Sequence, residues 1–276
     1  MLVAIREHFA GRENVHLAVN QFFGSYEERA RYGLLQKMEI EGWGWSRIAT
    51  HLMPASYRTS FGLVKEREVD VLMDASGFAF GDQHPAERTV QFAERVTSAK
   101  RAGTPVILLP QALGPFTDPM MRDAFAQVLD AADLVFARDE ISFRHASDVR
   151  AAPDTLFRAP DFTNLIQPSS SAERRAARTV AIVPNHRMIE KAEAEGDARA
   201  YVPFMLRCIT AVAAVGLRPF LLIHEQDDWE LARTIQEQAS RDISIRTEST
   251  PVALKALLGR CDLVVGSRFH ALVGAL

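Results

Sequence analysis

The chain has 276 residues, of which 47% are apolar and 24% charged, and its formal net charge is −3. This length suits two domains of ordinary size, and the composition is that of a globular protein rather than a disordered or fibrous one. A weakly acidic protein has no global attraction for nucleic acid or anionic lipid. Any anion that it binds must therefore be held by local groups.

The N-terminal segment and the cysteines favour the cytoplasm. Arg6, Glu7 and His8 come too early for the apolar core of a signal peptide, and no run reaches the roughly 18 apolar residues that span a bilayer. Cys208 and Cys261 stand in apolar runs, which is typical of buried thiols in a reducing compartment. The chain has no C-x-x-C spacing, so we expect a cytoplasmic protein with neither metal nor cofactor.

Strand-like and helix-like stretches alternate along the first part of the chain. Strands are predicted for the apolar runs NVHLAVNQ, DVLMDAS, PVILLPQ and ADLVFAR, whose near-continuous apolarity is typical of a parallel sheet covered on both faces. Helices are predicted for SYEERARYGLLQKM, PAERTVQFAERVTSAKRAG and DPMMRDAFAQVLDAA. Residues 41–65 fit a loop with a short helix.

A break at NLIQPSSSAERRAAR predicts an interdomain linker, after which the alternation restarts. Strands are expected at TVAIVPN, RPFLLIHE, ISIRT and CDLVVGS, and helices at DARAYVPFMLRCITAVAAVG, DDWELARTIQEQAS and TPVALKALLG. Asp227 with Glu230 predicts a capping box for the second of these helices. The expected fold is α/β, with two Rossmann-like doubly wound domains that face each other, at residues 1–166 and 179–276, joined by a linker at 167–178.

Ligands of doubly wound sheets bind beyond the carboxyl ends of the strands, so the residues that follow each strand are the candidates for a site. These are the segments SGFAFGDQH (76–84), QALGPF (111–116), RDEIS (138–142), DFTN (161–164), NHRM (185–188) and SRFHAL (267–272). We expect their cationic side chains to point into one interdomain crevice. These side chains are Arg138, His186, Arg187, Arg268 and His270.

The segment after the last strand makes the most specific prediction. Ser267 is a good N-cap, which would place Arg268, Phe269 and His270 in the first turn of a helix, where backbone N–H groups and the helix dipole favour an anion. An arginine adds a bidentate contact to phosphate or carboxylate. The alternative is that Arg268 pairs with a carboxylate of the other domain and that His270 is a neutral histidine packed in the core.

Structural alternatives stay open for the other segments. Residues 138–142 also fit a helix start in which Arg138 pairs with one of the two acidic residues that follow it. Residues 76–84 also fit a flexible turn, because their glycine spacing matches neither the dinucleotide fingerprint nor the P-loop. Residues 185–188 also fit a solvated loop, and Asp161 fits a simple turn.

Together these motifs resemble the polysaccharide pyruvyl transferase family over most of the chain from about residue 70 to its end. The resemblance rests on the order and spacing of DVLMDASGFAFGDQ, PVILLPQALGPFTD, LVFARDEISF, the APDF step and LVVGSRFHALVGAL. It implies a fold similar to the two-domain GT-B glycosyltransferases, with an acceptor-side N-terminal domain and a donor-side C-terminal domain. The implied activity moves the enolpyruvyl unit of phosphoenolpyruvate to two sugar hydroxyls, giving a pyruvate ketal and phosphate, in exopolysaccharide or cell-wall biosynthesis.

The resemblance also implies roles for single residues. Arg268 and Arg138 would clamp the anion, and His270 would contact the phosphate or act as general acid or base, since its ordinary pKa lies near neutrality. Further donor-binding residues implied are Ser267, Phe269, His186 and Arg187. The residues implied on the acceptor side are Gly77, Gly81, Asp82 and Gln111.

The implied partners are phosphoenolpyruvate as donor substrate and a sugar or polysaccharide acceptor, with no nucleic acid and no membrane span. Peripheral association with a membrane through a lipid-linked acceptor stays open, as does an oligomer. Two other functions also stay open. One is a GT-B glycosyltransferase that uses a nucleotide sugar, with Glu225 as the carboxylate for the ribose. The other is a catalytically inactive binding homologue.

The sequence departs from the family's pattern at both ends. The family opens with a strand and a glycine-containing loop, whereas the pattern of this chain predicts that it starts in the helix after them, at LVAIREHF. A further strand and helix normally follow the R-x-H-A-L segment, which here is close to the last residue. We therefore expect a chain that is short at both ends and retains binding more readily than catalysis.

Overall fold

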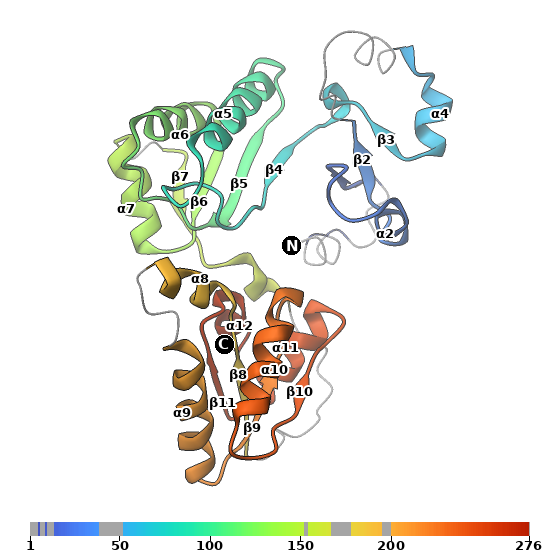
Figure 1. Ribbon diagram of the computed structural model, residues 1–276. Coiled ribbons are helices and arrows are strands. Elements are labelled where there is room, and N and C mark those ends of the chain that lie inside the picture. Colours follow the sequence, from blue (N-terminus) through green and yellow to red (C-terminus); the bar gives the residue numbers. More distant parts are fainter. Residues whose placement is uncertain are drawn as a thin grey trace. The chain divides into compact units, whose positions relative to one another are not determined.

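The computed structural model describes residues 14–38, 52–151, 154–166, 178–194 and 200–275, together with Ile5 and Phe9. The chain divides into two compact units that meet in the sequence between Pro160 and Asp161 (Figure 1). We call them the N-terminal unit and the C-terminal unit. Three predictions lie largely outside the described residues: the initial helix, residues 41–51 of the ambiguous stretch, and the linker up to residue 177.

The N-terminal unit opens with a sheet of short parallel strands in the order β1-β2-β3. Its elements are β1 (Ala18–Val19), α2 (Tyr26–Arg31), β2 (Leu35–Lys37), α4 (Ala55–Ser60), β3 (Leu63–Val64) and the 3-10 helix η1 (Glu66–Glu68). The prediction of one helix over residues 25–38 is wrong in its second half. Gly33 adopts a left-handed backbone with φ of 62°, which stops the helix and lets the chain turn into β2.

The larger sheet of the N-terminal unit has the order β4-β5-β6-β7, with all neighbours parallel. Its elements are β4 (Leu72–Asp74), α5 (Ala86–Arg101), β5 (Val106–Gln111), α6 (Pro119–Ala131), β6 (Leu134–Ala137), α7 (Glu140–Val149) and β7 (Leu156–Arg158). The strands and helices predicted for this part are confirmed. The carboxylates of Asp118 and Asp139 cap α6 and α7, since each accepts a backbone N–H three residues further along.

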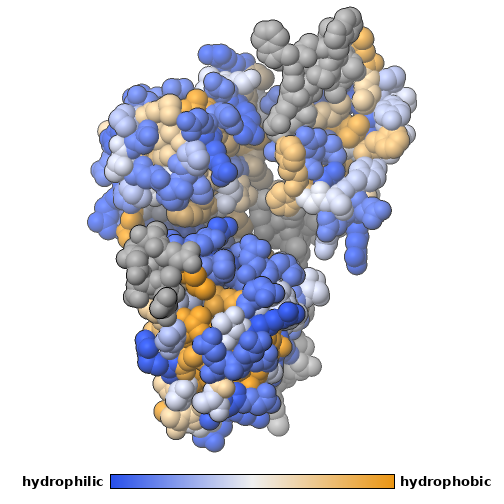
Figure 2. Space-filling model, viewed as in Figure 1, coloured by the Kyte–Doolittle hydropathy of each residue, from blue (hydrophilic) through white to orange (hydrophobic). Residues whose placement is uncertain are grey.

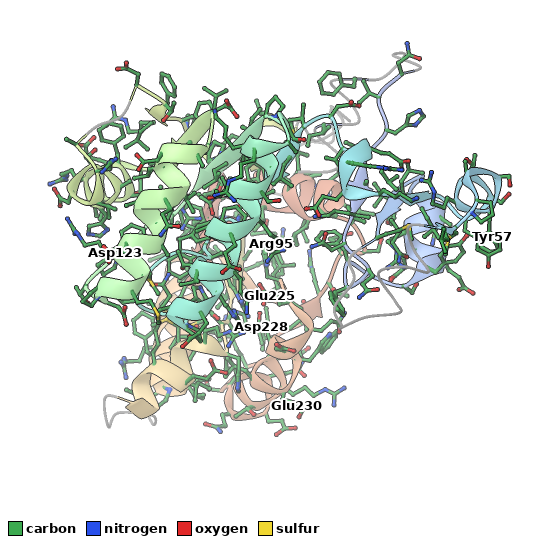
Figure 3. The ribbon with its side chains drawn as sticks, turned by 90° about the horizontal axis from the view of Figure 1, so that it is seen from above. Tyr57, Arg95, Asp123, Glu225, Asp228 and Glu230 are labelled. Atoms are coloured by element: carbon green, nitrogen blue, oxygen red, sulfur yellow. The ribbon has the colours of Figure 1, made fainter. Side chains whose placement is uncertain are left out.

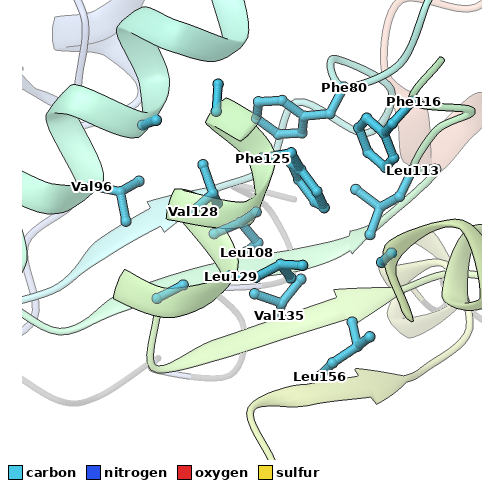
Figure 4. Packing of buried hydrophobic residues seen from close by; sticks show 14 of the residues in the cluster. Phe80, Val96, Leu108, Leu113, Phe116, Phe125, Val128, Leu129, Val135 and Leu156 are labelled. Atoms are coloured by element: carbon cyan, nitrogen blue, oxygen red, sulfur yellow. The ribbon is translucent and has the colours of Figure 1, made fainter. Parts of the chain in front are cut away.

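Helices α5 and α6 pack together on one face of this sheet (Figure 4). Phe125 of α6 lies at the centre of the cluster, with its ring stacked on that of Phe116 at a centroid distance of 4.4 Å. Val106 and Leu108 of β5 are buried beneath these helices, whereas Ile107 between them is only partly buried. Helices α5 and α6 thus both cover the face of the sheet on which Val106 and Leu108 lie.

The C-terminal unit contains a parallel sheet in the order β10-β9-β8-β11. Its elements are η2 (Phe162–Leu165), β8 (Thr179–Val183), α8 (Arg187–Ala194), α9 (Tyr201–Ala214), β9 (Arg218–Leu222), η3 (Gln226–Asp228), α10 (Trp229–Gln238), β10 (Ile245–Arg246), α11 (Pro251–Gly259), β11 (Leu263–Gly266) and α12 (Phe269–Gly274). The chain moves outward from β8 through β9 to β10 and then returns to the other side of β8 as β11. This is the doubly wound order, and its topological switch point lies between β8 and β11.

Helices cover both faces of the C-terminal sheet. Val180 and Ile182 of β8 pack with α9 and α10, while Ala181 and Val183 pack with α11 and α12. The whole of β8 is buried, as its continuous apolar sequence predicts, and each such valine or isoleucine contributes about 1.5–3 kcal/mol by leaving water. The α/β class and the parallel sheets are thus confirmed.

Residues 161–166 belong to the C-terminal unit, whereas the predicted N-terminal domain extends to residue 166. The 3-10 helix η2 packs on α12, and Lys255 Nζ of α11 donates a hydrogen bond to the carbonyl oxygen of Thr163 at 3.1 Å. These contacts place Asp161, which precedes η2, with the strand ends of the C-terminal unit.

Hydrophilic residues cover most of the described surface on the face in Figure 2. Among the described residues, no helix is both long enough and apolar enough to cross a membrane. Cys208 and Cys261 are free and half-buried rather than fully buried as expected.

Candidate functional site

Polar side chains gather at the carboxyl ends of β8, β9 and β11 in the C-terminal unit. We call them the strand-end cluster: Asp161, Asn185, His186, Tyr201, His224, Glu225, Asp228, Ser267, Arg268 and His270. The cluster lies at the switch point between β8 and β11, where doubly wound sheets bind ligands.

A hydrogen-bond network fixes the backbone at this point. The Tyr201 hydroxyl accepts the backbone N–H of Asn185 at 3.1 Å and lies 2.9 Å from Ser267 Oγ. Asn185 Nδ2 donates to the carbonyl oxygen of Ser267 at 3.1 Å. Burial raises the pKa of Tyr201, so this phenol stays neutral over the physiological range. The ends of β8 and β11 and the start of α9 are thereby held together.

The guanidinium of Arg268 lies between the carboxylates of Glu225 and Asp228, two residues that Figure 3 labels. Its Nη2 and Nε donate to the Asp228 carboxylate at 2.7 and 3.1 Å, in a bidentate pair. Its Nη1 lies 2.7 Å from Glu225 Oε2. Asp228 also accepts the backbone N–H of His186 at 2.9 Å. The prediction that Arg268 sits at a strand end is confirmed, but the carboxylates that it contacts lie in its own unit rather than in the other domain.

Two predicted helix caps are wrong, and both lie next to a residue of this ion pair. Ser267 does not cap α12: the N-cap is Arg268, without a side-chain hydrogen bond, and the Ser267 hydroxyl is used by Tyr201. Asp227 does not cap α10 either, because η3 precedes that helix and its N-cap is Asp228. The Asp228 carboxylate is used by Arg268 instead of by the helix.

His270 faces Asp161. Its Nε2 lies 3.7 Å from Asp161 Oδ2, and the side chain of His270 is 47% exposed while that of Asp161 is 4% exposed. The other oxygen of Asp161 accepts the backbone N–H and the hydroxyl of Thr163 at 2.9 and 2.6 Å. The alternative of a histidine packed in the core is therefore wrong. Asp161 is more than a turn residue, because it holds a buried carboxylate beside the imidazole.

His224 was missed by the sequence analysis, although it follows β9 and the strand-end rule would have found it. Its Nδ1 is buried and has no hydrogen-bond partner among the described residues. Burial lowers the pKa of His224; nearby Glu225 opposes this shift, and nearby His270 adds to it. A neutral imidazole thus lies within electrostatic reach of His270. Asp228 was also missed as a site residue, because the capping-box pattern drew attention to its neighbour.

The remaining residues predicted on the donor side make fewer contacts within the strand-end cluster. His186 contributes its backbone N–H to Asp228 and is half-buried. Arg187 begins α8 rather than lying in a loop, and its exposed guanidinium pairs with Glu190 at 3.1 Å. Phe269 is exposed, with its ring edge-on to that of His270 at a centroid distance of 5.5 Å.

In the N-terminal unit, two loops that follow β4 and β5 run side by side. We call residues 77–82 and 111–117 the paired loops. Their hydrogen bonds join Ala112 N–H to Gly77 O, Gly114 N–H to Phe80 O, Asp82 N–H to Pro115 O, and Thr117 N–H and hydroxyl to the Asp82 carboxylate. The Thr117 hydroxyl is the main cause of a lowered pKa of Asp82. The alternative of a flexible turn is therefore wrong.

Glycines and a buried amide hold the paired loops together. A Cβ on Gly114 would lie 2.6 Å from the Cβ of His145, and one on Gly81 would lie 2.6 Å from the carbonyl oxygen of Gly114. Gln111 is fully buried, and its Nε2 donates to Asp74 Oδ2 at 2.9 Å. Gln111 thus supports the loops from inside the unit, which contradicts the prediction that it lines the acceptor side. Gly77 has open space around it, and its φ of 73° requires glycine.

Arg138 follows β6 and links one of these loops to α7. Its Nη1 donates to the carbonyl oxygen of Gly77 at 3.4 Å, and its Nε lies 3.8 Å from Asp139 Oδ2. Asp139 also caps α7, so the alternative of a helix start is confirmed. A role for Arg138 as anion clamp, and the shared crevice with Arg268, stay predictions.

Among the described residues, no three His, Cys, Asp or Glu side chains are placed to hold a metal ion together. The strand-end cluster instead offers a fixed arginine, three imidazoles and an exposed carboxylate. Groups of this kind bind anions and transfer protons.

Comparison with known proteins gives similarities of very different extent. The chain is 30% identical over 207 residues to a protein nucleotidyltransferase, YdiU of Bradyrhizobium sp. (strain ORS 278), and the match covers 67% of this chain and 37% of that protein. The structure is similar to that of HepE of Anabaena, solved in complex with UDP and glucose, with a TM-score of 0.46 and 15% identity over 95% of this chain and 68% of that one.

One protein family matches nearly the whole length of the chain. The polysaccharide pyruvyl transferase family matches residues 13–276, a range that includes both the paired loops and the strand-end cluster. The chain therefore belongs to the polysaccharide pyruvyl transferase family, a family of transferases.

Proposed function

We propose that this chain transfers the enolpyruvyl unit of phosphoenolpyruvate to two hydroxyls of a sugar or polysaccharide, forming a pyruvate ketal and releasing phosphate. The observation that carries the proposal is that a fixed Arg268 and an exposed His270 both lie at the switch point of the C-terminal sheet. Membership of the family indicates the reaction class. Arg268 and His270 supply the two groups that the reaction needs, a cation that binds the donor and an imidazole that transfers protons.

Arg268 is suited to hold the anionic donor. Asp228 fixes the guanidinium at one edge through Nε and Nη2, so Nη1 at the other edge is the part that a phosphate or carboxylate can reach. A guanidinium that is already oriented loses little further entropy when it binds an anion. This arrangement supports a donor site on the C-terminal unit.

His270 is suited to the proton transfers. Ketal formation requires a proton at the methylene carbon of the donor, which makes the neighbouring carbon electrophilic toward a sugar oxygen. Loss of phosphate and attack by a second hydroxyl complete the ketal, and each attacking hydroxyl gives up its proton. In this mechanism His270 donates and accepts protons, and the buried carboxylate of Asp161 faces its Nε2 at 3.7 Å.

The paired loops are the proposed acceptor side. The ring of Phe78 is exposed on the first loop, and His84 Nε2 lies 2.9 Å from the carbonyl oxygen of Phe78. An aromatic ring on a loop that is held by hydrogen bonds offers a fixed apolar surface to a sugar. Phe78 lies on the same loop as Gly77, Gly81 and Asp82, the residues predicted for the acceptor side. We place the reaction in the cytoplasm, a location that the free thiols of Cys208 and Cys261 support.

A nucleotide-sugar transferase is the competing function. It would present a carboxylate to the ribose of the nucleotide, and Glu225 is the candidate at this strand end. Because Glu225 lies 2.7 Å from Arg268, it would have to leave the guanidinium in order to bind a ribose. Competition between phosphoenolpyruvate and a nucleoside diphosphate separates the two functions.

The test is phosphate release from phosphoenolpyruvate with and without glycan acceptors, with binding measured by calorimetry. Arg268→Lys keeps a positive charge opposite Asp228 but loses the fork, so we expect donor binding to weaken about 10- to 100-fold. Arg233→Lys is the matched control, because that arginine is exposed on α10 and faces Glu230. Preferential binding of the nucleotide, or unchanged donor affinity in Arg268→Lys, contradicts the proposal. Donor binding without turnover on any acceptor identifies an inactive homologue.

A further inference from the structure

The carboxylates that contact Arg268 differ in how firmly they are held. Asp228 is 0% exposed, contacts two nitrogens of the guanidinium and also accepts the backbone N–H of His186. Removing a charge of this kind from its partner costs several kcal/mol. Asp228 is therefore a permanent counter-ion that fixes the arginine.

Glu225 is held much less firmly. Its side chain is 51% exposed and reaches the guanidinium at Nη1, at 2.7 Å. A half-exposed ion pair is worth little, because water solvates the carboxylate almost as well once it swings away. A second cation is close by: the pKa of Arg187 is raised, chiefly by Glu190 and in smaller part by Glu225. Glu225 thus has both solvent and Arg187 as alternatives to Arg268.

The place that Glu225 occupies is the place an incoming anion needs. The side chain of Arg268 is 11% exposed, and its Nε and Nη2 are occupied by Asp228. An anion must therefore approach along Nη1, where it would meet a like charge at contact distance. Like charges a few ångströms apart near a surface repel each other by several kcal/mol, so both cannot stay.

We propose that Glu225 is a displaceable stand-in for the donor's anionic group on Arg268, and that it sets the affinity of this site for anions. In the unliganded protein Glu225 neutralises Arg268, and a ligand binds by exchange for it. Every anion then binds more weakly by the loss of this ion pair, and a donor that carries both a phosphate and a carboxylate has a second charged group with which to offset that loss. The identity of that donor as phosphoenolpyruvate rests on the proposed function, whereas the exchange itself requires only an anion.

The experiment compares three forms of the full chain by calorimetry with two probes, phosphoenolpyruvate and inorganic phosphate. The forms are the natural sequence, Glu225→Gln and Glu230→Gln. Glu230 is the matched control, since its side chain is 88% exposed and it lies away from Glu225 and Asp228 in Figure 3. We expect Glu225→Gln to bind both anions about 3- to 10-fold more tightly than the natural sequence, and Glu230→Gln to bind them unchanged.

The outcomes separate this inference from the proposed function. If the natural sequence binds phosphoenolpyruvate and Glu225→Gln binds it no more tightly, the inference is overturned while the proposed function stands. If Glu225→Gln gains affinity for inorganic phosphate although neither form binds phosphoenolpyruvate, the inference stands and the proposed donor is wrong. Absence of anion binding in Glu225→Gln overturns the inference, provided that its unfolding midpoint matches that of the natural sequence. Glu225→Ala gives the same comparison without an amide near Arg268.

Discussion

The two units hold the loops at their strand ends in different ways. In the N-terminal unit, backbone hydrogen bonds and closely packed glycines lock the paired loops together. In the C-terminal unit, side chains do this, with the buried Asp228 and the Tyr201 network at the centre. The first arrangement is sensitive to added volume, and the second to lost charge or lost hydrogen bonds. Substitutions of each kind should therefore act mainly on one unit.

The largest expected effect is that of Asp228→Ala. The substitution leaves the guanidinium of Arg268 without its buried counter-ion and the N–H of His186 without its acceptor. We expect the free energy of unfolding to fall by about 3–5 kcal/mol, measured by urea denaturation. The control Asp227→Ala removes an exposed carboxylate of the same turn. It should change the free energy of unfolding by less than about 0.5 kcal/mol. Equal effects of the two substitutions would show that Asp228 does not organise this unit.

The matching test in the N-terminal unit is Gly114→Ala against Gly103→Ala. The two glycines have nearly the same φ, 78° and 79°, but an added Cβ meets His145 at the first and nothing within 4 Å at the second. A left-handed alanine costs about 1–2 kcal/mol, and overpacking adds about 1–3 kcal/mol. We expect a loss of roughly 2–5 kcal/mol for Gly114→Ala and about 1–2 kcal/mol for Gly103→Ala. If the two losses are equal, close packing of the loops contributes nothing.

Local patterns predicted the elements of this fold better than its contacts. The run TVAIVPN predicted β8, and Asp118 before a proline predicted the start of α6. Both predictions succeeded because apolar periodicity and capping act over a few residues. The strand β2 was missed because residues 35–37 continue the apolar spacing of the preceding helix. Its pairing with β1 and β3 is a tertiary property that a short window does not contain.

The candidate site was predicted in part for the same reason. The rule that ligands bind beyond strand ends found Arg268 and His270. The partner of Arg268, however, lies 40 residues earlier in the sequence, and no local signal marks it. Asp228 stands beside Asp227, and the capping pattern favoured the wrong one of two adjacent aspartates. A buried ion pair between strand ends becomes visible once the strand order is known.

Asp161→Asn tests the charged environment of His270 without removing the imidazole. The amide keeps the size of the side chain but removes the negative charge that lies 3.7 Å from the imidazole. We expect kcat for pyruvyl transfer to fall about 10-fold, with KM for phosphoenolpyruvate nearly unchanged. Asp242→Asn, at an exposed position of the same unit, is the control. A rise in KM at constant kcat would assign Asp161 to donor binding instead.

The smallest effect should come from His224, whose behaviour depends on pH. Burial lowers its pKa in the folded state, whereas the unfolded chain takes up this proton near pH 6.5. Between the two pKa values the unfolded state binds more protons, so the free energy of unfolding falls as the pH drops below about 6.5, by at most about 1.4 kcal/mol per pH unit. His224→Gln should remove this part of the slope, measured by urea denaturation from pH 7.5 to 5. An unchanged slope would mean that His224 is as well solvated as in the unfolded chain. The C-terminal unit would then owe its sensitivity to charge to Asp228 and Arg268.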